Sequence, residues 1–252
     1  MKILSVVNQK GGVGKTTTSI NLSACLYKMK RRVLLVDLDP QSNATRGSGI
    51  NESMIQNSMN DVLLDRVHIE KAIIKSQFDG YDILPATPSL TESEVVLVTR
   101  DEREFILKNK LTSILSRYDY VIMDCPPSLN ILTVNSLVSA TGVLIPVQCE
   151  FYALQGLSEL INTINQIQNT SNQKLKIEGI LRTMFDLRNN LSNDVSDQLK
   201  EHFPGELYKT KIPRNIRVAE APSFGKSILE YDGLSKGSLS YYSLSGEIIK
   251  DE

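Results

Sequence analysis

The sequence predicts an α/β protein with a mostly parallel, twisted sheet and helices packed on both faces of that sheet. Short apolar runs typical of buried strands alternate along the chain with longer segments whose apolar residues recur at helical spacing. The 252 residues are 41% hydrophobic and 23% charged, which is ordinary for a globular chain that can bury a sizeable core. No repeat, linker or low-complexity stretch interrupts the alternation, so we expect a single domain over residues 1–252.

The first half of the chain opens with a strand, a glycine-rich loop and a helix. Apolar periodicity and turn residues indicate the elements that follow, although residues 46–80 carry weaker signals. The expected elements are a strand at 3–7, a helix at 16–29, a strand at 33–36, short helical pieces at 61–65 and 69–74, a strand at 81–86 and an amphipathic helix at 102–117.

The second half continues the alternation of strands and helices, which favours crossover connections and parallel strands. Ser192 stands at the start of one helical pattern, where a serine side chain commonly caps a helix. The expected elements are a strand at 118–124, a helix at 129–140, a strand at 142–147, a helix at 151–167, a strand from 176, a helix at 192–202, a short strand before 212–215 and a docking helix within 237–252.

Residues 10–18 read K-G-G-V-G-K-T-T-T and connect the first predicted strand to the first predicted helix. Glycines let the backbone curl so that successive N–H groups point at phosphate oxygens, and the positive end of the helix adds to the attraction. In such a loop Lys15 reaches the β- and γ-phosphates, and the Thr16 hydroxyl binds Mg²⁺. The sequence therefore predicts a P-loop that binds a nucleotide through Lys10, Gly11, Gly12, Val13, Gly14, Lys15, Thr16 and Thr17.

The loop departs from the usual pattern, G-x-x-x-x-G-K-[ST], because Gln9 stands where glycine is expected and Lys10 adds a second lysine. A lysine at the loop entrance cannot easily fold onto its own phosphates, so we expect Lys10 to serve a neighbouring subunit. The stretch closely resembles the deviant Walker A form, K-G-G-x-G-K-[ST], of the superfamily that includes ParA, MinD and the nitrogenase iron protein. The resemblance implies a P-loop NTPase fold, ATP as the nucleotide, and a homodimer in which Lys15 and the Lys10 of the other subunit are catalytic.

Three carboxylates stand at the ends of predicted parallel strands, where α/β proteins place their ligands. Asp124 ends a hydrophobic strand in the Walker B arrangement and is expected to hold Mg²⁺, commonly through a water. Asp37 and Asp39, two residues apart, could approach the phosphates and the metal. The stretch D-L-D-P-Q at 37–41 resembles the second motif of ParA-type ATPases, which implies that Asp39 positions the attacking water and Asp37 lies near the metal. Ser42 stands where many members have glycine, a change that we do not expect to abolish activity.

Two further sites rest on the resemblance to chromosomal ParA proteins of the Soj type. The turn at 212–215 corresponds to a loop that lies against the adenine, which implies nucleotide contacts from Pro213 and Asn215. Arg188 and Arg217 stand where these proteins carry arginines that bind DNA phosphates without sequence preference. Because the net charge is −1, such binding requires a local basic patch. Its further candidates are Arg214, Lys209, Lys211, Lys226 and Lys236.

The remaining features bear on location and on the alternatives. Three cysteines without close spacing argue against a zinc site or a disulfide framework, and with no signal segment or long apolar run they favour the cytoplasm. The P-loop starts almost at residue 1, so we expect no separate N-terminal DNA-binding domain. Residues 237–252 carry one lysine and three acidic residues, unlike the basic amphipathic tail by which a MinD-like protein lies on anionic lipid.

Taken over nearly the whole chain, the motifs resemble those of the ParA/Soj partitioning ATPases. The resemblance implies a cytoplasmic, nucleoid-associated enzyme that dimerises with Mg-ATP, binds non-specific double-stranded DNA and does not bind membranes. A centromere-binding ParB-like protein would stimulate slow hydrolysis and so drive chromosome or plasmid segregation. The alternatives are a MinD-like division-site ATPase, an electron-transfer iron protein and a nucleotide-switched regulator of replication initiation.

Overall fold

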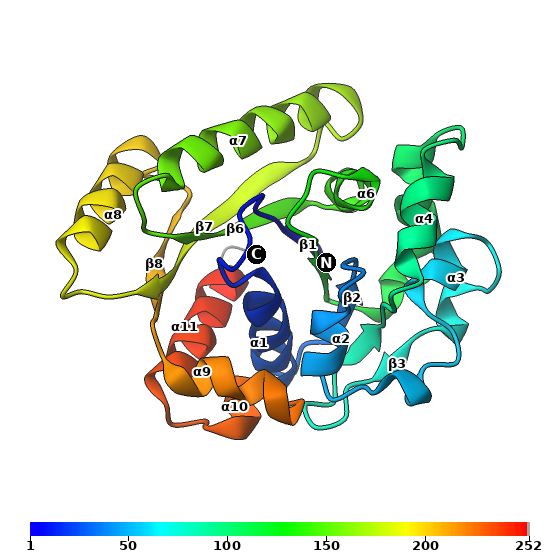
Figure 1. Cartoon of the computed structure of the whole chain (residues 1–252), viewed down its shortest axis with the longest axis horizontal. Coiled ribbons are helices and arrows are strands. Elements are labelled where there is room, and N and C mark those ends of the chain that lie inside the picture. The colour runs from blue at the N-terminus through cyan, green and yellow to red at the C-terminus, as the bar shows by residue number, and fades with distance from the viewer. Residues whose placement is uncertain (251–252) are drawn as a thin grey trace.

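An eight-stranded sheet forms the centre of the computed structural model, which describes residues 1–250 (Figure 1). The strands lie in the order β3-β4-β2-β5-β1-β6-β7-β8, and every neighbouring pair is parallel except β3 and β4. The expected α/β fold with a mostly parallel sheet is therefore confirmed. The strands are β1 (Lys2–Val6), β2 (Val33–Asp37), β3 (Ile74–Lys75), β4 (Asp82–Leu84), β5 (Tyr120–Asp124), β6 (Gly142–Gln148), β7 (Lys176–Phe185) and β8 (Leu207–Pro213).

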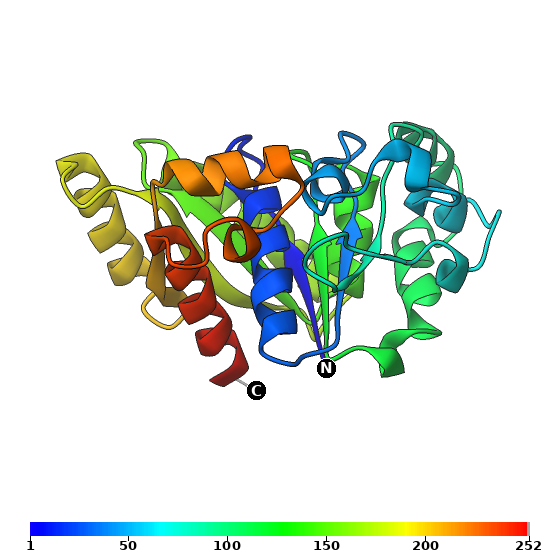
Figure 2. The same ribbon diagram turned by 90° about the horizontal axis from the view of Figure 1, so that it is seen from below.

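Helices cover both faces of the sheet. On the first face lie α1 (Lys15–Lys28), α2 (Asn43–Gly47), α9 (Ile216–Glu220), α10 (Ile228–Tyr231) and α11 (Lys236–Lys250). Figure 2 shows α1, in blue, and α11, in red, side by side on this face. On the second face lie α3 (Met59–Leu63), α4 (Leu90–Leu97), α5 (Ile106–Thr112), α6 (Ile131–Ser139), α7 (Ala153–Thr170) and α8 (Asn190–His202). Short 3₁₀ turns occur at Glu52–Met54, Ile69–Lys71, Arg103–Phe105, Leu115–Arg117 and Ala221–Phe224.

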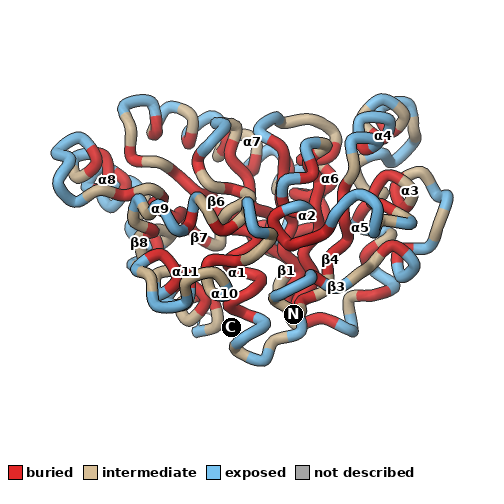
Figure 3. The backbone as a smooth tube through the Cα atoms, turned by 60° about the horizontal axis from the view of Figure 1, so that its bottom comes forward, coloured by how far each residue is buried: buried red, intermediate tan, exposed pale blue. Residues whose placement is uncertain are grey.

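Each central strand contributes to two hydrophobic cores, one under each layer of helices. In β2, Leu34 packs into the core of the second face and Leu35 into that of the first, because successive side chains of a strand point to opposite faces. Strands buried on both faces read as continuous apolar runs, which is why the sequence predicts them well. Figure 3 shows the buried trace concentrated in the central strands, with exposed residues on the outer helices and loops.

The strand order brings the predicted site residues to one edge of the sheet. β5 lies between β1 and β2, and all three strands run parallel. In register, Asp124 at the end of β5 stands opposite Val6 of β1 and Asp37 of β2. The loop after β1 and the carboxylates that end β2 and β5 therefore lie close together at the carboxyl ends of these three strands.

The C-terminal segment packs against the first helix. The hydroxyls of Thr18 on α1 and Tyr241 on α11 lie 3.3 Å apart, and the Asn21 side chain accepts the N–H of Ile228 at 2.7 Å. Tyr241, Leu244 and Ile248 are fully or almost fully buried. The expected docking helix is thus α11, although Asp251 and Glu252 at its acidic end lie outside the described residues. Among residues 1–250, no helix has both the length and the apolarity that crossing a bilayer requires.

The predicted continuous helix at 102–117 is wrong. The segment is divided into a 3₁₀ turn, α5 and a second 3₁₀ turn. The side chain of Asn135, on α6, accepts the N–H of Leu107 at 3.0 Å and donates to the carbonyl of Arg103 at 2.8 Å. This buried amide thus satisfies backbone groups on both sides of the first break, so a continuous helix is not needed there.

Other boundaries also differ from the prediction. Helix α4 was not identified, and Ile74 joins the antiparallel strand β3 instead of ending a helical piece. The predicted cap at Ser192 is wrong, because α8 starts two residues earlier and Ser192 lies within it. Its hydroxyl instead donates to the carbonyl of Cys149 at 3.3 Å and ties the first turn of α8 to the end of β6.

Candidate functional site

The glycine-rich loop connects β1 to α1 and is held by hydrogen bonds from elsewhere in the fold. Gly12 and Gly14 adopt positive φ angles of 74° and 88°, which glycine tolerates at little steric cost. The Thr183 hydroxyl, on β7, donates to the carbonyl of Val13 at 2.7 Å. The Asn8 side chain accepts the N–H of Lys10 at 2.9 Å. The loop is therefore preformed at the N-terminus of α1, in the geometry that suits a phosphate group.

Lys15 points into this loop. Its side chain is almost buried, and its Nζ donates to the carbonyl of Lys10 at 3.0 Å. Burial lowers the pKa of Lys15, while the nearby Asp124 and Asp39 oppose that shift. A cation in this position is available to an anion that occupies the loop.

Asp124 is fully buried and receives two hydroxyl groups from α1. Thr16 donates to Oδ2 at 2.8 Å and Ser19 to Oδ1 at 2.9 Å. Burial, and then the charge of Asp37, raise the pKa of this carboxyl. Ser19 was not predicted, although its position one turn after Thr16 places both hydroxyls on one helix face.

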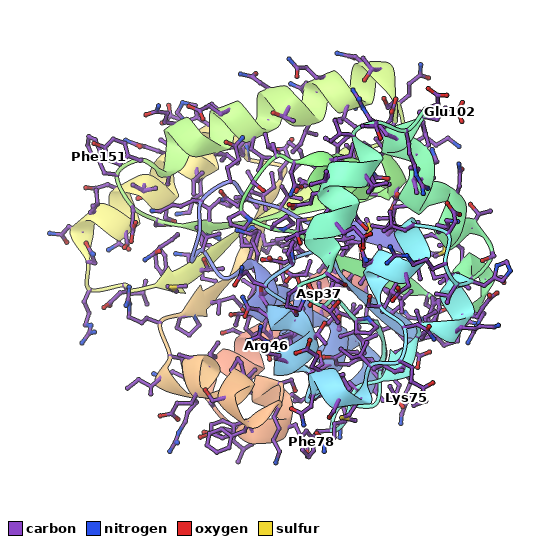
Figure 4. All side chains as sticks on the ribbon, turned by 45° about the vertical axis from the view of Figure 1, so that its right-hand side comes forward. Asp37, Arg46, Lys75, Phe78, Glu102 and Phe151 are labelled. Carbon is purple, nitrogen blue, oxygen red and sulfur yellow. The ribbon has the colours of Figure 1, made fainter. Side chains whose placement is uncertain are left out.

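Asp37 is also fully buried, and residues of the segment that follows β2 donate hydrogen bonds to it. The Thr45 N–H and hydroxyl donate to Oδ2 at 2.8 and 2.7 Å, and the Asp39 N–H donates to Oδ1 at 3.1 Å. Burial raises the pKa of Asp37. Figure 4 shows Asp37 deep within the molecule, close to α2.

These oxygen donors fit Mg²⁺. Among residues 1–250, no group of three His, Cys, Asp or Glu side chains is arranged to hold a metal by itself. Mg²⁺ is commonly bound by one or two carboxylates together with phosphate oxygens and waters. Thr16, Asp37 and Asp124 offer that incomplete set next to the phosphate loop. The buried carboxylates would be neutralised by the cation, which accounts for carboxyl groups at positions where burial opposes their charge.

Asp39 follows Asp37 on a tight turn at the edge of the site. Its side chain accepts the N–H of Gln41 at 2.9 Å, and its carbonyl accepts the N–H of Ser42 at 2.8 Å. Ser42 has a φ of 54°, in the left-handed region that favours glycine. The departure noted in the sequence therefore places a serine where the backbone conformation suits glycine better.

The side chain of Lys10, the first residue of the loop, points away from the loop. Its Nζ is 2.5 Å from Oε2 of Glu150, just after β6, and both side chains are 46% exposed. Phe151 and Tyr152 follow directly, pack edge to face with ring centres 5.0 Å apart, and are 75% and 69% exposed. Figure 4 shows Phe151 at the periphery. Glu150 was not predicted, since only the fold brings it to Lys10.

A small cavity of about 170 Å³ lies beside the loop, next to the start of α1. Gly14 and Thr17 line it from one side, and Pro213 and Asn215 from the other. The Asn215 side chain accepts the N–H groups of Arg217 at 2.8 Å and Val218 at 3.3 Å, which fixes its position as the N-cap of α9. The structure thus places the phosphate loop and the turn with Pro213 and Asn215 around one cavity, as the sequence predicts for a single nucleotide site.

The three candidate arginines lie on exposed segments that follow β7 and β8. Arg214 also lines the cavity beside the phosphate loop. Arg188 pairs with Asp186 at 2.9 Å, and its side chain is 90% exposed. Arg217 pairs with Glu220 at 3.1 Å. Arg214 is exposed and near enough to Asp186 to help lower the pKa of that carboxyl. Because β7 and β8 are neighbouring parallel strands, the arginines gather at one edge of the sheet.

The cysteines do not contribute a reactive group. Cys25, Cys125 and Cys149 are all unpaired and buried. Burial raises the pKa of Cys25 and Cys125 to about 12 and that of Cys149 to about 11, so none is a ready thiolate.

Comparison with known proteins agrees with this geometry. A family model described as an AAA domain matches residues 1–177. The sporulation initiation inhibitor protein Soj of Bacillus subtilis strain 168 is 48% identical over 247 residues, which cover 98% of this chain and 98% of Soj. The chain belongs to the ParA/Soj family of partitioning ATPases. Chromosome partitioning protein ParA of Myxococcus xanthus is another relative, 47% identical over 249 residues that cover 99% of this chain and 88% of that protein.

A solved structure with a bound nucleotide is also similar to this chain. It is described as cobyrinic acid a,c-diamide synthase from Mycobacterium smegmatis with bound ADP and magnesium. It is 35% identical, has a TM-score of 0.87, and matches 99% of this chain and 94% of its own. This ParA/Soj homologue therefore has the fold of a nucleotide-binding ATPase, as its sequence predicted.

Proposed function

We propose that this ParA/Soj homologue hydrolyses ATP in a Mg²⁺-dependent homodimer that binds non-specific DNA, and that it drives chromosome or plasmid segregation with a ParB-like partner. The observation that carries the proposal is the different placement of its two loop lysines. Lys15 is almost buried inside the phosphate loop, whereas Lys10 extends to the exposed rim and pairs with Glu150. One lysine thus serves its own nucleotide, and the other is free to serve a second subunit.

Within one subunit, the chain supplies the groups that an ATP-hydrolysing site needs. Backbone N–H groups from Gly11 to Thr17 and the Lys15 ammonium would hold the phosphates, and Pro213 and Asn215 would contact the adenine. Bound Mg²⁺ would neutralise phosphate charge, held by Thr16, Asp37 and Asp124. Asp39, on its tight turn, would orient the attacking water.

The second subunit would complete this site. Lys10 must leave Glu150 before it can reach the phosphates of another chain, and the exchange of one carboxylate for a triphosphate favours that move when ATP is bound. Phe151 and Tyr152, exposed beside Lys10, would be covered in the same step. Catalysis then depends on dimerisation, because phosphoryl transfer relies mainly on positioned charge.

DNA binding would follow from the arginines. Arg188, Arg214 and Arg217 are exposed at one edge of the sheet and would contact phosphates, a kind of binding that is sensitive to salt and blind to sequence. We further propose that residues 1–252 act as one domain in the cytoplasm, associated with the nucleoid. α11 packs its apolar face on α1, so it does not offer that face to a membrane as a MinD-like tail would.

The proposal is tested by DNA co-sedimentation at two salt concentrations with ATP, ADP or no nucleotide. We expect retention on DNA only with ATP, and weaker retention at the higher salt. Turnover measured with and without a DNA-bound ParB-like protein would then separate a partitioning ATPase from a non-hydrolysing regulator of replication initiation. Equal retention in all three nucleotide states would contradict the proposed switch.

A further inference from the structure

A second cavity, of about 430 Å³, lies between strands β7 and β8 and the end of α8. Four basic side chains line it, and they come from three elements: Arg182 from β7, Lys200 from α8, and Lys209 and Lys211 from β8. Arg182 and Lys211 are register partners in neighbouring strands. None of the four residues lines the cavity beside the phosphate loop.

Arg182 is the unusual member of this group. It occupies an interior position of β7, between Leu181 and Thr183, and is only 3% exposed. One Nη donates to the Ser196 hydroxyl at 3.0 Å and the other to the carbonyl of Tyr208 at 2.5 Å. Its Nε is buried and has no hydrogen-bond partner among residues 1–250. Within residues 1–250 Arg182 has no salt bridge, although the charges of Glu247 and Asp197 act on it from a distance. A buried guanidinium with a spare donor is costly unless an anion completes its surroundings.

The surrounding charges leave the cavity strongly positive. Within residues 1–250, Lys200 alone of the four has a salt bridge, to Asp197 at 2.6 Å. The Lys211 ammonium lies 3.9 Å from the ring centre of Phe185, a contact that attracts the cation without adding a negative charge. Burial, followed by the charges of Arg182 and Lys200, lowers the pKa of Lys211. The charge of Asp197 opposes this shift for Lys211, and Asp197 and Glu247 do the same for Arg182. The lining of the cavity nevertheless holds four basic and no acidic side chains, and within residues 1–250 three of the four have no salt bridge.

We propose that this cavity binds a small polyphosphate anion, the diphosphate group of a soluble molecule or pyrophosphate itself. Three cations without a salt bridge among residues 1–250 match the charge of a diphosphate better than that of a single phosphate. The planar guanidinium supplies directed N–H groups, and the lysines supply mobile charge. The site is separate from the ATP site and does not rest on the proposed function.

Edge protection and DNA contact, the two alternative roles for these basic side chains, account for less of the geometry. Lysines on an edge strand discourage pairing with another chain, which suits Lys209 and Lys211 on β8. Edge protection does not extend to Arg182, since β7 lies between β6 and β8. Contact with DNA suits exposed lysines, but a stiff duplex cannot bring a phosphate to a side chain that is 3% exposed.

The test is calorimetric titration of pyrophosphate into the full chain carrying Lys15→Ala, without Mg²⁺, so that the phosphate loop is impaired equally in every sample. The cavity variant adds Lys209→Gln and Lys211→Gln. Its matched control adds Lys28→Gln and Lys71→Gln, which remove two exposed lysines elsewhere. We expect the cavity variant to bind pyrophosphate at least tenfold more weakly than the control. Equal affinity in the two, or no binding to either, overturns the proposal.

A second measurement separates a small-molecule site from an extension of the DNA surface. The same two pairs of substitutions, now with Lys15 intact, are compared for ATP-dependent retention on double-stranded DNA. The sequence made Lys209 and Lys211 further candidates for the DNA patch, whereas the proposed site assigns them to a small anion, so we expect the cavity variant to retain DNA as well as the control does. If it loses DNA binding beyond the control, the lysines belong to the DNA surface and the proposed site is wrong. Matching thermal unfolding curves confirm that both variants are folded.

Discussion

Lys10 Nζ and Glu150 Oε2 lie 2.5 Å apart and join the entrance of the phosphate loop to the segment that follows β6. Both side chains are about half exposed, so the pair contributes only about 0–1 kcal/mol. A contact this weak can hold Lys10 in one subunit and still yield to the stronger attraction of a triphosphate in another.

Replacing Glu150→Gln should favour ATP-dependent dimers. Lys10 then loses its carboxylate partner within the subunit. A symmetric dimer contains two such lysines, so the free energy of up to about 2 kcal/mol corresponds to a dimer dissociation constant lower by up to about thirtyfold. Analytical ultracentrifugation with ATP measures the change, with Glu159→Gln on α7 as a matched exposed control. Lys10→Ala should bind ATP but fail to gain dimers with it. If Lys10→Ala dimerises normally, the assignment of Lys10 to a second subunit is wrong.

Lys15→Ala should remove the main side-chain contact with the phosphates. A hydrogen bond to a charged group contributes about 1.5–3 kcal/mol, so ATP affinity should fall at least about tenfold. Calorimetry measures it, and Lys28→Ala at the other end of α1 is the control. Normal affinity in the Lys15 variant would refute the assignment of the loop.

Asp39→Ala should separate binding from hydrolysis. The side chain lies on a turn beside the site and is not one of the groups that hold the loop, so ATP binding should persist. Loss of the group that orients water should slow turnover by about a hundredfold or more, and dimers should accumulate. Phosphate release measured alongside ATP binding checks both halves of this expectation. Wild-type turnover would count against Asp39, whichever way binding changed.

Ser42→Gly should stabilise the protein. The left-handed conformation costs a residue other than glycine about 1–2 kcal/mol, and the greater freedom of glycine in the unfolded chain offsets about half of the gain. The net increase in the free energy of unfolding should be about 0.5–1 kcal/mol, measured by denaturant unfolding. Ser42→Ala is the control, because it removes the hydroxyl but keeps the strain. Equal stability of the glycine and alanine variants would show that the backbone is relaxed at this turn.

Arg217→Glu should weaken DNA retention while ATP binding persists. Losing one phosphate contact should also reduce the slope of log affinity against log salt by about 1. Arg103→Glu, on an exposed 3₁₀ turn outside the arginine edge, serves as the control. Unchanged DNA affinity at low salt would remove Arg217 from the DNA surface.

The parts of the site that follow strand ends could be predicted from sequence. Asp37 and Asp124 close continuous apolar runs, and parallel strands carry such residues to one edge of the sheet. Glu150 and Arg182 could not be found this way. Glu150 meets Lys10 across 140 positions of sequence, and Arg182 interrupts an apolar run without any pattern to show which partners it faces.

Predictions from neighbouring residues also failed where a hydrogen bond to a residue distant in sequence determined the local structure. Asn135 satisfies backbone groups at the break before α5, so the apolar periodicity of 102–117 overstated the helix. Ser192 resembles a cap by residue type, but its hydroxyl bonds to Cys149 instead. Both errors arise from tertiary hydrogen bonds, which a reading of neighbouring residues does not contain.

The pairing of α1 with α11 has a consequence for the synthesis of the protein. Thr18 and Tyr241 meet across 223 positions, and β1 is flanked by β5 and β6, which are made much later. The phosphate loop is among the first segments to leave the ribosome, yet the helix behind it gains its packing partner only when the chain is nearly complete. A chain that ends before α11 lacks this packing partner, and non-local pairing of this kind makes folding late and comparatively slow.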